Sequence, residues 1–277
     1  MFPSVLDSAT FIARGFRIIS NPHSAGLARE SEDLRERSTR ATLLEGVAVI
    51  SRAVDGGVQL ITQPDHAHLA SRFMEHYVPL AARARRAVIL RAIAEHDNGW
   101  AEEDAAPTVN PETGGIADFV SAPLSVRQRV WPRGVARLAS EPWAAALVAQ
   151  HAITVYDRYR SDALWSPFFK EMEEARAAMI QASGLTLEDL AVDYPFVRLA
   201  DLISLTFCVG WTDEQRYREW TVQLSGTRVN VIPWGGAEIP IAIQARVIPN
   251  RPFRSDAELR EALRAASPTT LRGVVAA

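Results

Sequence analysis

Residues 92–100, AIAEHDNGW, decide how the fold of this chain is interpreted. They close an apolar run that is typical of a buried helix, and Asn98-Gly99 supplies a stop signal for that helix. His96 and Asp97 are therefore expected side by side at the C-terminal end of a helix. A buried carboxylate is costly unless a metal ion, an arginine or backbone amides lie beside it. The pattern thus indicates a buried polar site at a helix end.

Two other helical patterns carry residues of the same chemistry. Residues 63–84 open with Gln-Pro-Asp, which suits a first helical turn, and place His66 early in the helix. Residues 196–211 are apolar nearly all round, as expected of a central buried helix, and contain Asp201. Arg198 lies one turn before Asp201. A buried Asp–Arg pair is therefore the alternative to a ligand role for Asp201.

His151 stands in the middle of a further helical pattern, residues 142–159. Its interpretation stays open between a packed core residue, a ligand of a second metal ion and a substrate contact. No histidine follows it to complete a second metal site. Cys208 is the only cysteine, which excludes an internal disulfide and a cysteine-based zinc site. A metal ion in this chain must therefore be held by histidine and carboxylate.

Strand-like segments lie at both ends of the helical stretch. Residues 47–62 contain two β-prone runs around Asp-Gly-Gly and predict a hairpin. After Trp211, WTVQLSG, TRVNVIP and IPIAIQARVIP predict strands, and the early hairpin is placed to pair with them in one small sheet. Residues 101–134 are rich in Pro, Gly and acidic side chains, which predicts a long irregular loop.

The motifs resemble those of a known superfamily. AIAEHDNGW is similar to the HD signature of metal-dependent phosphohydrolases, which also use a histidine on an earlier helix and an aspartate on a later one. More closely, QPDHAHLAS, AIAEHDNGW, the NPETG loop and LADLISLTFC together resemble an uncharacterised bacterial domain-of-unknown-function family with an HD-like motif, from about Gly46 onward. The resemblance implies that His66, His96, Asp97 and Asp201 bind metal, and it makes His151 a candidate ligand of a second ion.

These patterns and the resemblance predict a mainly α fold, an HD-like helical bundle with a small peripheral antiparallel β-sheet. Residues 1–45 are expected to form a partly ordered N-terminal extension because they are highly charged. Residues 46–277 are expected to form a single HD-like domain. Its helical body covers residues 64–212, and its β-rich part covers residues 213–277.

The ligand types suggest a chemistry. Imidazole and carboxylate suit one or two divalent Fe, Mn, Zn or Ni ions, and a metal-bound water is acidic enough to attack near neutral pH. Asp97 is the candidate base toward that water, and Arg198 and Arg72 are candidates for binding a phosphate. The leading hypothesis is a metal-dependent hydrolase of a phosphate ester or nucleotide, with Asp97 and Arg198 as catalytic residues. An HD-type di-iron oxygenase and a non-catalytic helical scaffold or ligand sensor are the alternatives.

Composition limits the partners. A net charge of −3, with arginines spread along the chain, gives no reason to expect nucleic acid or an anionic membrane. The sequence contains neither a signal-peptide pattern nor an apolar window long enough to span a bilayer, so a cytoplasmic protein is expected. The expected partner is a small-molecule substrate, phosphorylated under the leading hypothesis. The N-terminal extension and the apolar β segments are candidates for an interface with a partner or, in a homodimer, with a second copy of the chain.

Overall fold

A β-hairpin begins the part of the chain that the computed structural model describes, residues 49–277. β1 (Ile50–Val54) and β2 (Gly57–Ile61) pair antiparallel. The turn between them contains Gly56 with φ 76°, a left-handed conformation that glycine adopts at no steric cost. The predicted hairpin is confirmed. The predicted extension, residues 1–45, lies outside the described residues.

The hairpin forms one end of a seven-stranded sheet with the order β1-β2-β6-β7-β5-β4-β3. The remaining strands are β3 (Gln215–Tyr217), β4 (Trp220–Ser225), β5 (Arg228–Ile232), β6 (Ile239–Ile248) and β7 (Pro268–Ala276). Neighbouring strands are antiparallel except β5 and β7, which are parallel. β2 pairs with β6 from Val58↔Ile248 onward, so the early hairpin and the late strands do share one sheet, as expected.

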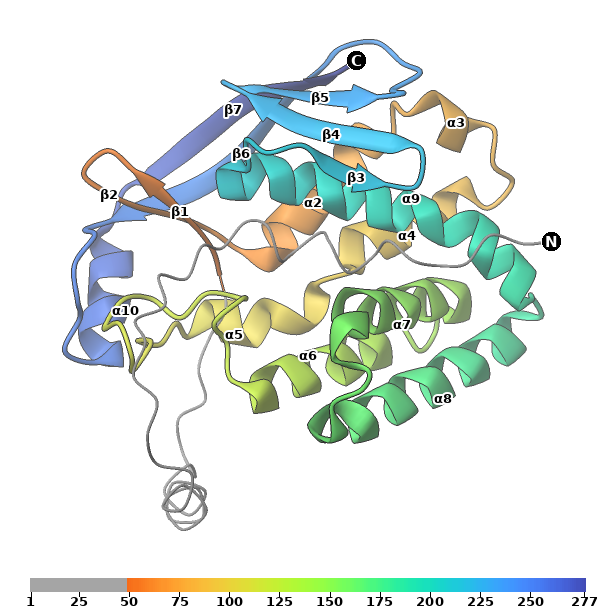
Figure 1. Cartoon of the computed structure of the whole chain (residues 1–277), viewed down its shortest axis with the longest axis horizontal. Coiled ribbons are helices and arrows are strands. Elements are labelled where there is room, and N and C mark those ends of the chain that lie inside the picture. The colour runs from red at the N-terminus through yellow and green to blue at the C-terminus, as the bar shows by residue number, and fades with distance from the viewer. Residues whose placement is uncertain (1–48) are drawn as a thin grey trace, which may run out of the picture.

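The predicted fold class, a mainly α HD-like bundle with a small peripheral antiparallel sheet, is wrong. The sheet has seven strands of mixed direction and forms a whole layer of the fold (Figure 1). β6 alternates buried and exposed residues over much of its length, which shows that one face packs on the helices. β7 begins with a proline and lacks a clear apolar alternation. Its strand conformation depends on pairing with β6 from Ile239↔Val275 to Arg246↔Pro268, which no local pattern reveals.

The helices lie in layers below the sheet. α2 and α9 are nearest to the sheet, α4 and α7 pack against them, and α6 and α8 lie farther out (Figure 1). α3, α5 and α10 are the other α-helices of residues 49–277. The bounds are α2 (Gln63–Met74), α3 (Val78–Ala81), α4 (Arg86–Glu95), α5 (Ala101–Ala105), α6 (Leu124–Arg137), α7 (Pro142–Tyr156), α8 (Ser166–Ser183), α9 (Leu187–Leu205) and α10 (Asp256–Ala265).

Local sequence signals fix the ends of the helices that matter for the site. The Thr62 hydroxyl accepts a hydrogen bond from the Asp65 amide and caps α2. Thr186 and Asp189 form a reciprocal capping box at the start of α9. α9 then continues as one π-helical turn, Thr206–Gly210. No helix among residues 49–277 is both long and apolar enough to cross a bilayer.

The predicted irregular loop over residues 101–134 is confirmed for residues 106–123 and wrong at both ends, which contain α5 and most of α6. The sequence of α6 includes Pro132 and Gly134, which disfavour a helix interior when only local preferences are considered. Gly134 is required by packing instead. A Cβ built on it would lie 2.7 Å from the Asn98 Oδ1 atom. α6 therefore approaches the turn that follows His96 and Asp97.

Candidate metal centre

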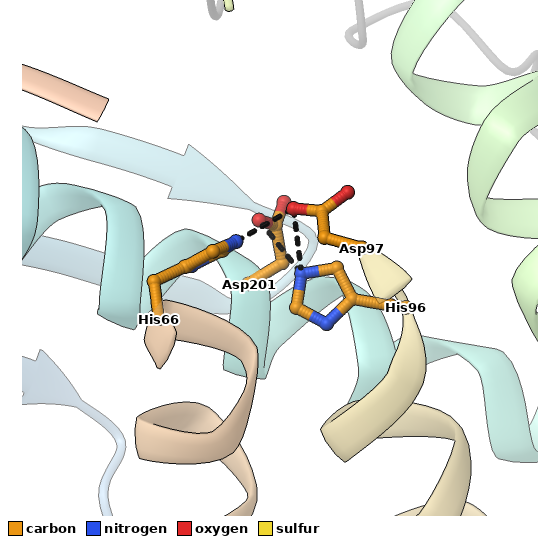
Figure 2. A group of neighbouring side chains, drawn as sticks. All are labelled: His66, His96, Asp97 and Asp201. Atoms are coloured by element: carbon orange, nitrogen blue, oxygen red, sulfur yellow. Dashed lines mark hydrogen bonds and ion pairs between the residues drawn. The ribbon is translucent and has the colours of Figure 1, made fainter. Parts of the chain in front are cut away.

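Four buried side chains from three helices meet at one point (Figure 2). His66 comes from the first turn of α2, and Asp201 comes from the last turn of α9. His96 and Asp97 follow directly after α4. One ligand atom from each of the four residues lies within 4.8 Å of all the others. The structure therefore brings together the four residues that the resemblance assigned to metal, and this group could hold an ion.

The imidazole of His96 is oriented by the main chain. Its Nδ1 atom lies 2.7 Å from the Ile93 carbonyl oxygen, which can only accept, so Nδ1 carries the hydrogen of the neutral ring. Its Nε2 atom lies 3.4 Å from Asp97 Oδ2 and 3.4 Å from Asp201 Oδ1. Neither contact has hydrogen-bond geometry, and Nε2 is buried. A buried ring nitrogen without a hydrogen bond between two carboxylates is suited to binding a cation.

Ser204 orients the imidazole of His66 through its Nδ1 atom, as the Ile93 carbonyl does for His96. The Ser204 hydroxyl donates to the Asp201 carbonyl oxygen at 3.1 Å, so it accepts from His66 Nδ1 at 2.9 Å. The Nε2 atom of His66 then presents its lone pair toward Asp97 Oδ2, which lies only 2.6 Å away. Two acceptors at this distance share a hydrogen when no metal ion is bound. An ion bound by both residues would take the place of that hydrogen. The donor set thus fits a metal ion at both histidines.

Asp201 combines the two roles that the sequence left as alternatives. Its Oδ2 atom accepts a hydrogen bond from Arg198 Nη1 at 2.6 Å, while its Oδ1 atom faces His96. Burial alone would raise the pKa of the Asp201 carboxyl, but His96, His151 and Arg198 together hold that pKa well below its usual range. Burial also opposes the charged form of His96, yet Asp97 and Asp201 raise its pKa to about 9. Without a metal ion, the carboxylates therefore favour a protonated His96.

His151 lies beside the group of four. It is buried, its Nε2 atom lies 3.6 Å from Asp201 Oδ2, and its Nδ1 atom lies 3.3 Å from the Tyr194 hydroxyl. Burial lowers the pKa of His151 to about 3 despite the nearby Asp201 carboxylate, so the ring is neutral near neutral pH. A role as a second-metal ligand or a substrate contact stays a prediction for this residue.

A cavity of about 280 Å³ opens next to the four side chains. Asp97, His151 and Asp201 form part of its wall. Three arginines and five large aromatic side chains also line it, namely Arg127, Arg158, Arg198, Trp100, Phe119, Trp131, Tyr156 and Trp211. Arg198 was expected at the site from the sequence. Arg72 does not line the cavity, because its guanidinium donates to the Ala242 carbonyl oxygen on β6.

The turn that carries Asp97 is held by α6, which the sequence did not predict. Arg133 donates to the Gly99 carbonyl oxygen at 3.2 Å, and Arg137 donates to the Asn98 carbonyl oxygen. Arg133 also pairs with Glu103, which is buried. These contacts fix the backbone immediately after Asp97. Arg127 and Arg158 were missed as well, because nothing in their local sequence places them at the cavity.

Fold and site together define a protein of mixed helix and sheet with a buried His/Asp group that could hold a metal ion. The chain belongs to the family described as a protein of unknown function (DUF3891), whose model matches residues 49–250. This range contains the four converging residues and the whole cavity wall. No curated protein and no solved structure matches the chain. The match agrees with the resemblance to a domain-of-unknown-function family, whereas the HD resemblance rests on the residues alone.

Proposed function

We propose that this protein is a metal-dependent hydrolase of a phosphate ester, in which His66, His96, Asp97 and Asp201 bind the metal. The observation that carries the proposal is the His96 Nε2 atom, which is buried between two carboxylates and has no hydrogen bond. A structural ion pair would use that nitrogen as a hydrogen-bond donor. A coordinated cation instead uses its lone pair. The resemblance to the HD phosphohydrolases supports the same assignment.

The donor set suits Fe, Mn, Zn or Ni, because two imidazoles and two carboxylates are ligands that these ions share. Such an ion would make a bound water acidic enough to attack a phosphoryl group near neutral pH. The Ile93 carbonyl and the Ser204 hydroxyl keep both Nε2 atoms directed at the site. Asp97 also borders the cavity, where its carboxylate can accept a proton from the attacking water.

The charge of the cavity supports an anionic substrate. Its wall contains three arginines and three aspartates, which are Arg127, Arg158, Arg198, Asp97, Asp201 and Asp213. A divalent ion would add two positive charges to this balanced set, so the loaded cavity attracts anions. Arg198 borders the cavity beside Asp201, where its guanidinium is placed to bind a phosphate oxygen. A volume of about 280 Å³ restricts the substrate to a small molecule.

The test is phosphate release by the full chain loaded separately with Fe, Mn, Zn and Ni, using a panel of small phosphomonoesters and nucleotides. We expect activity with at least one ion, lost on chelation and restored by that ion. Asp97→Asn keeps the side-chain size but removes the base and one anionic ligand, so it should abolish activity. His68→Ala is the matched control, because His68 lies on α2 with His66 but is exposed. A protein that binds metal and releases no phosphate from any of these compounds would refute the hydrolase.

A further inference from the structure

Two arginines at the cavity wall have no carboxylate partner in the part of the chain that the structure describes. Arg127 belongs to α6 and Arg158 to the short 3-10 helix Asp157–Tyr159, and both line the cavity that contains Asp97 and Asp201. Within residues 49–277, neither guanidinium forms an ion pair with Asp or Glu. The Nε atom of Arg127 is buried and has no hydrogen-bond partner among these residues. Such a pair of cations has donors available for an anionic ligand.

Aromatic side chains hold the two guanidiniums in place. The Tyr159 hydroxyl lies 2.8 Å from Arg158 Nη2 and 3.5 Å from Arg127 Nη1. The Arg158 guanidinium lies 4.6 Å from the Tyr159 ring centre, and the Arg127 guanidinium lies 5.6 Å from the Trp165 ring centre. The Tyr159 and Trp165 rings are themselves stacked, with 4.8 Å between their centres. The arginines are therefore positioned by cation–π contacts, which do not neutralise their charge.

The arginine pair is separated from the four metal-site residues. Ring contacts lead outward from His151 to Trp131 at 5.6 Å, from Trp131 to Tyr156 at 6.1 Å, and from Tyr156 to Tyr159 at 6.3 Å. Trp131 and Tyr156 also line the cavity. One continuous space thus joins the metal-site residues, an aromatic middle and two arginines without a carboxylate partner among the described residues.

We propose that Arg127 and Arg158 form a second anion subsite of this cavity, which binds an acidic group of the substrate other than the phosphate to be hydrolysed. The substrate class is then a small phosphate ester that carries a second phosphate or a carboxylate, with an apolar or planar part between the two charges. The assignment of the hydrolysed phosphate rests on the proposed function. Anion binding by the two arginines does not depend on it.

The experiment compares two probes on the metal-loaded full chain by calorimetry, namely alkane bisphosphonates of increasing length and the matching monophosphonates. We expect one bisphosphonate to bind at least about tenfold more tightly than its monophosphonate, because a second charged contact is formed. Arg127→Gln with Arg158→Gln should remove this advantage and leave the metal content unchanged. Arg158 is exposed, so Arg158→Gln alone leaves the packed core intact. This single variant should remove part of the bisphosphonate advantage, which separates a lost contact from a folding defect. Arg264→Gln, at an exposed residue on α10, is the control and should bind like the wild type.

Equal affinity for both probes in the wild type, or a full bisphosphonate advantage in the double variant, would overturn the second subsite while the proposed hydrolase stands. Failure of the proposed hydrolase can also be told apart from failure of the second subsite. If the chain binds no metal, inorganic phosphate is titrated into the metal-free protein instead. Binding that the double variant loses would support the subsite without the hydrolase, and binding that the double variant retains would overturn it.

Discussion

Replacing Arg198 by methionine should destabilise the metal-free protein much more than the metal-loaded protein. Arg198 and Asp201 are both buried, and their side chains share a hydrogen bond of 2.6 Å. Breaking a buried ion pair by removing one partner costs roughly 3–5 kcal/mol, because the remaining charge loses most of its compensation. Without metal, Asp201 would keep only the positive charge of His96, which it shares with Asp97. With an ion bound, Asp201 keeps a positive partner, and the loss approaches that of one charged hydrogen bond, about 1.5–3 kcal/mol. The two costs differ by about 2 kcal/mol.

Thermodynamic linkage turns this difference into a gain in metal affinity. If the ion reduces the cost of the substitution by about 2 kcal/mol, the substitution must tighten ion binding by the same free energy, which is about thirtyfold. Denaturant unfolding with and without metal measures the first quantity, and competition with a chelator measures the second. The expected result is therefore a less stable protein that binds its ion more tightly.

Arg85→Met is the matched control for Arg198→Met. Arg85 forms an ion pair of 2.5 Å with Asp193, which is buried on the same helix, α9, but does not border the cavity. Its loss should destabilise the protein equally with and without metal. If Arg198→Met behaved like this control, with an unchanged metal affinity, the ion would not be bound at Asp201 and the reasoning would be refuted.

Three further substitutions test the surroundings of the site. Ser204→Ala removes the acceptor for His66 Nδ1, so metal affinity measured by chelator competition should fall by about tenfold or more, and an unchanged affinity would contradict this role. Gly99→Ala would place a Cβ 1.9 Å from the Val130 carbonyl oxygen, so thermal unfolding should show a loss of roughly 1–3 kcal/mol or more, whereas an unaltered Tm would argue against the close packing. Burial raises the pKa of Asp104 well above its usual value, although the hydrogen bond from the backbone N–H of Gln63 opposes this shift. The stability contributed by protonated Asp104 is present at low pH and is lost as the pH rises through the raised pKa. Asp104→Asn should therefore gain stability relative to the metal-free wild type as the pH rises above the usual pKa of an aspartate, about 4, and a difference independent of pH would refute this.

Asp201 and the His96-Asp97 pair could be singled out from the sequence because their chemistry conflicts with their surroundings, whereas His66 came from the resemblance to the HD proteins. An aspartate in the apolar run 196–211 and a His-Asp pair at the end of another apolar run are costly unless they meet partners. The structure brings His66, His96, Asp97 and Asp201 together, as expected. The sequence offered both a pair with Arg198 and a ligand role for Asp201, and the structure places Asp201 where both are satisfied.

The fold class and the rest of the cavity wall could not be predicted in the same way, because both depend on tertiary partners. β7 is a strand through its pairing with β6, and α6 is a helix despite Pro132 and Gly134. Because the local sequence of residues 124–134 predicts a loop, it gives Arg127 no defined position. Local preferences describe a segment on its own, whereas these segments take their conformation from what packs against them.

The most direct measurement is the metal content of the full chain after reconstitution with Fe, Mn, Zn and Ni in turn. The His96→Ala, Asp97→Ala double variant is compared with the exposed-site control His68→Ala, and circular dichroism verifies that each remains folded. A stoichiometric ion in the wild type and the control, absent from a folded double variant, is the predicted result. No bound ion under any of these conditions, or an ion fully retained by the double variant, would contradict a metal centre at these four residues.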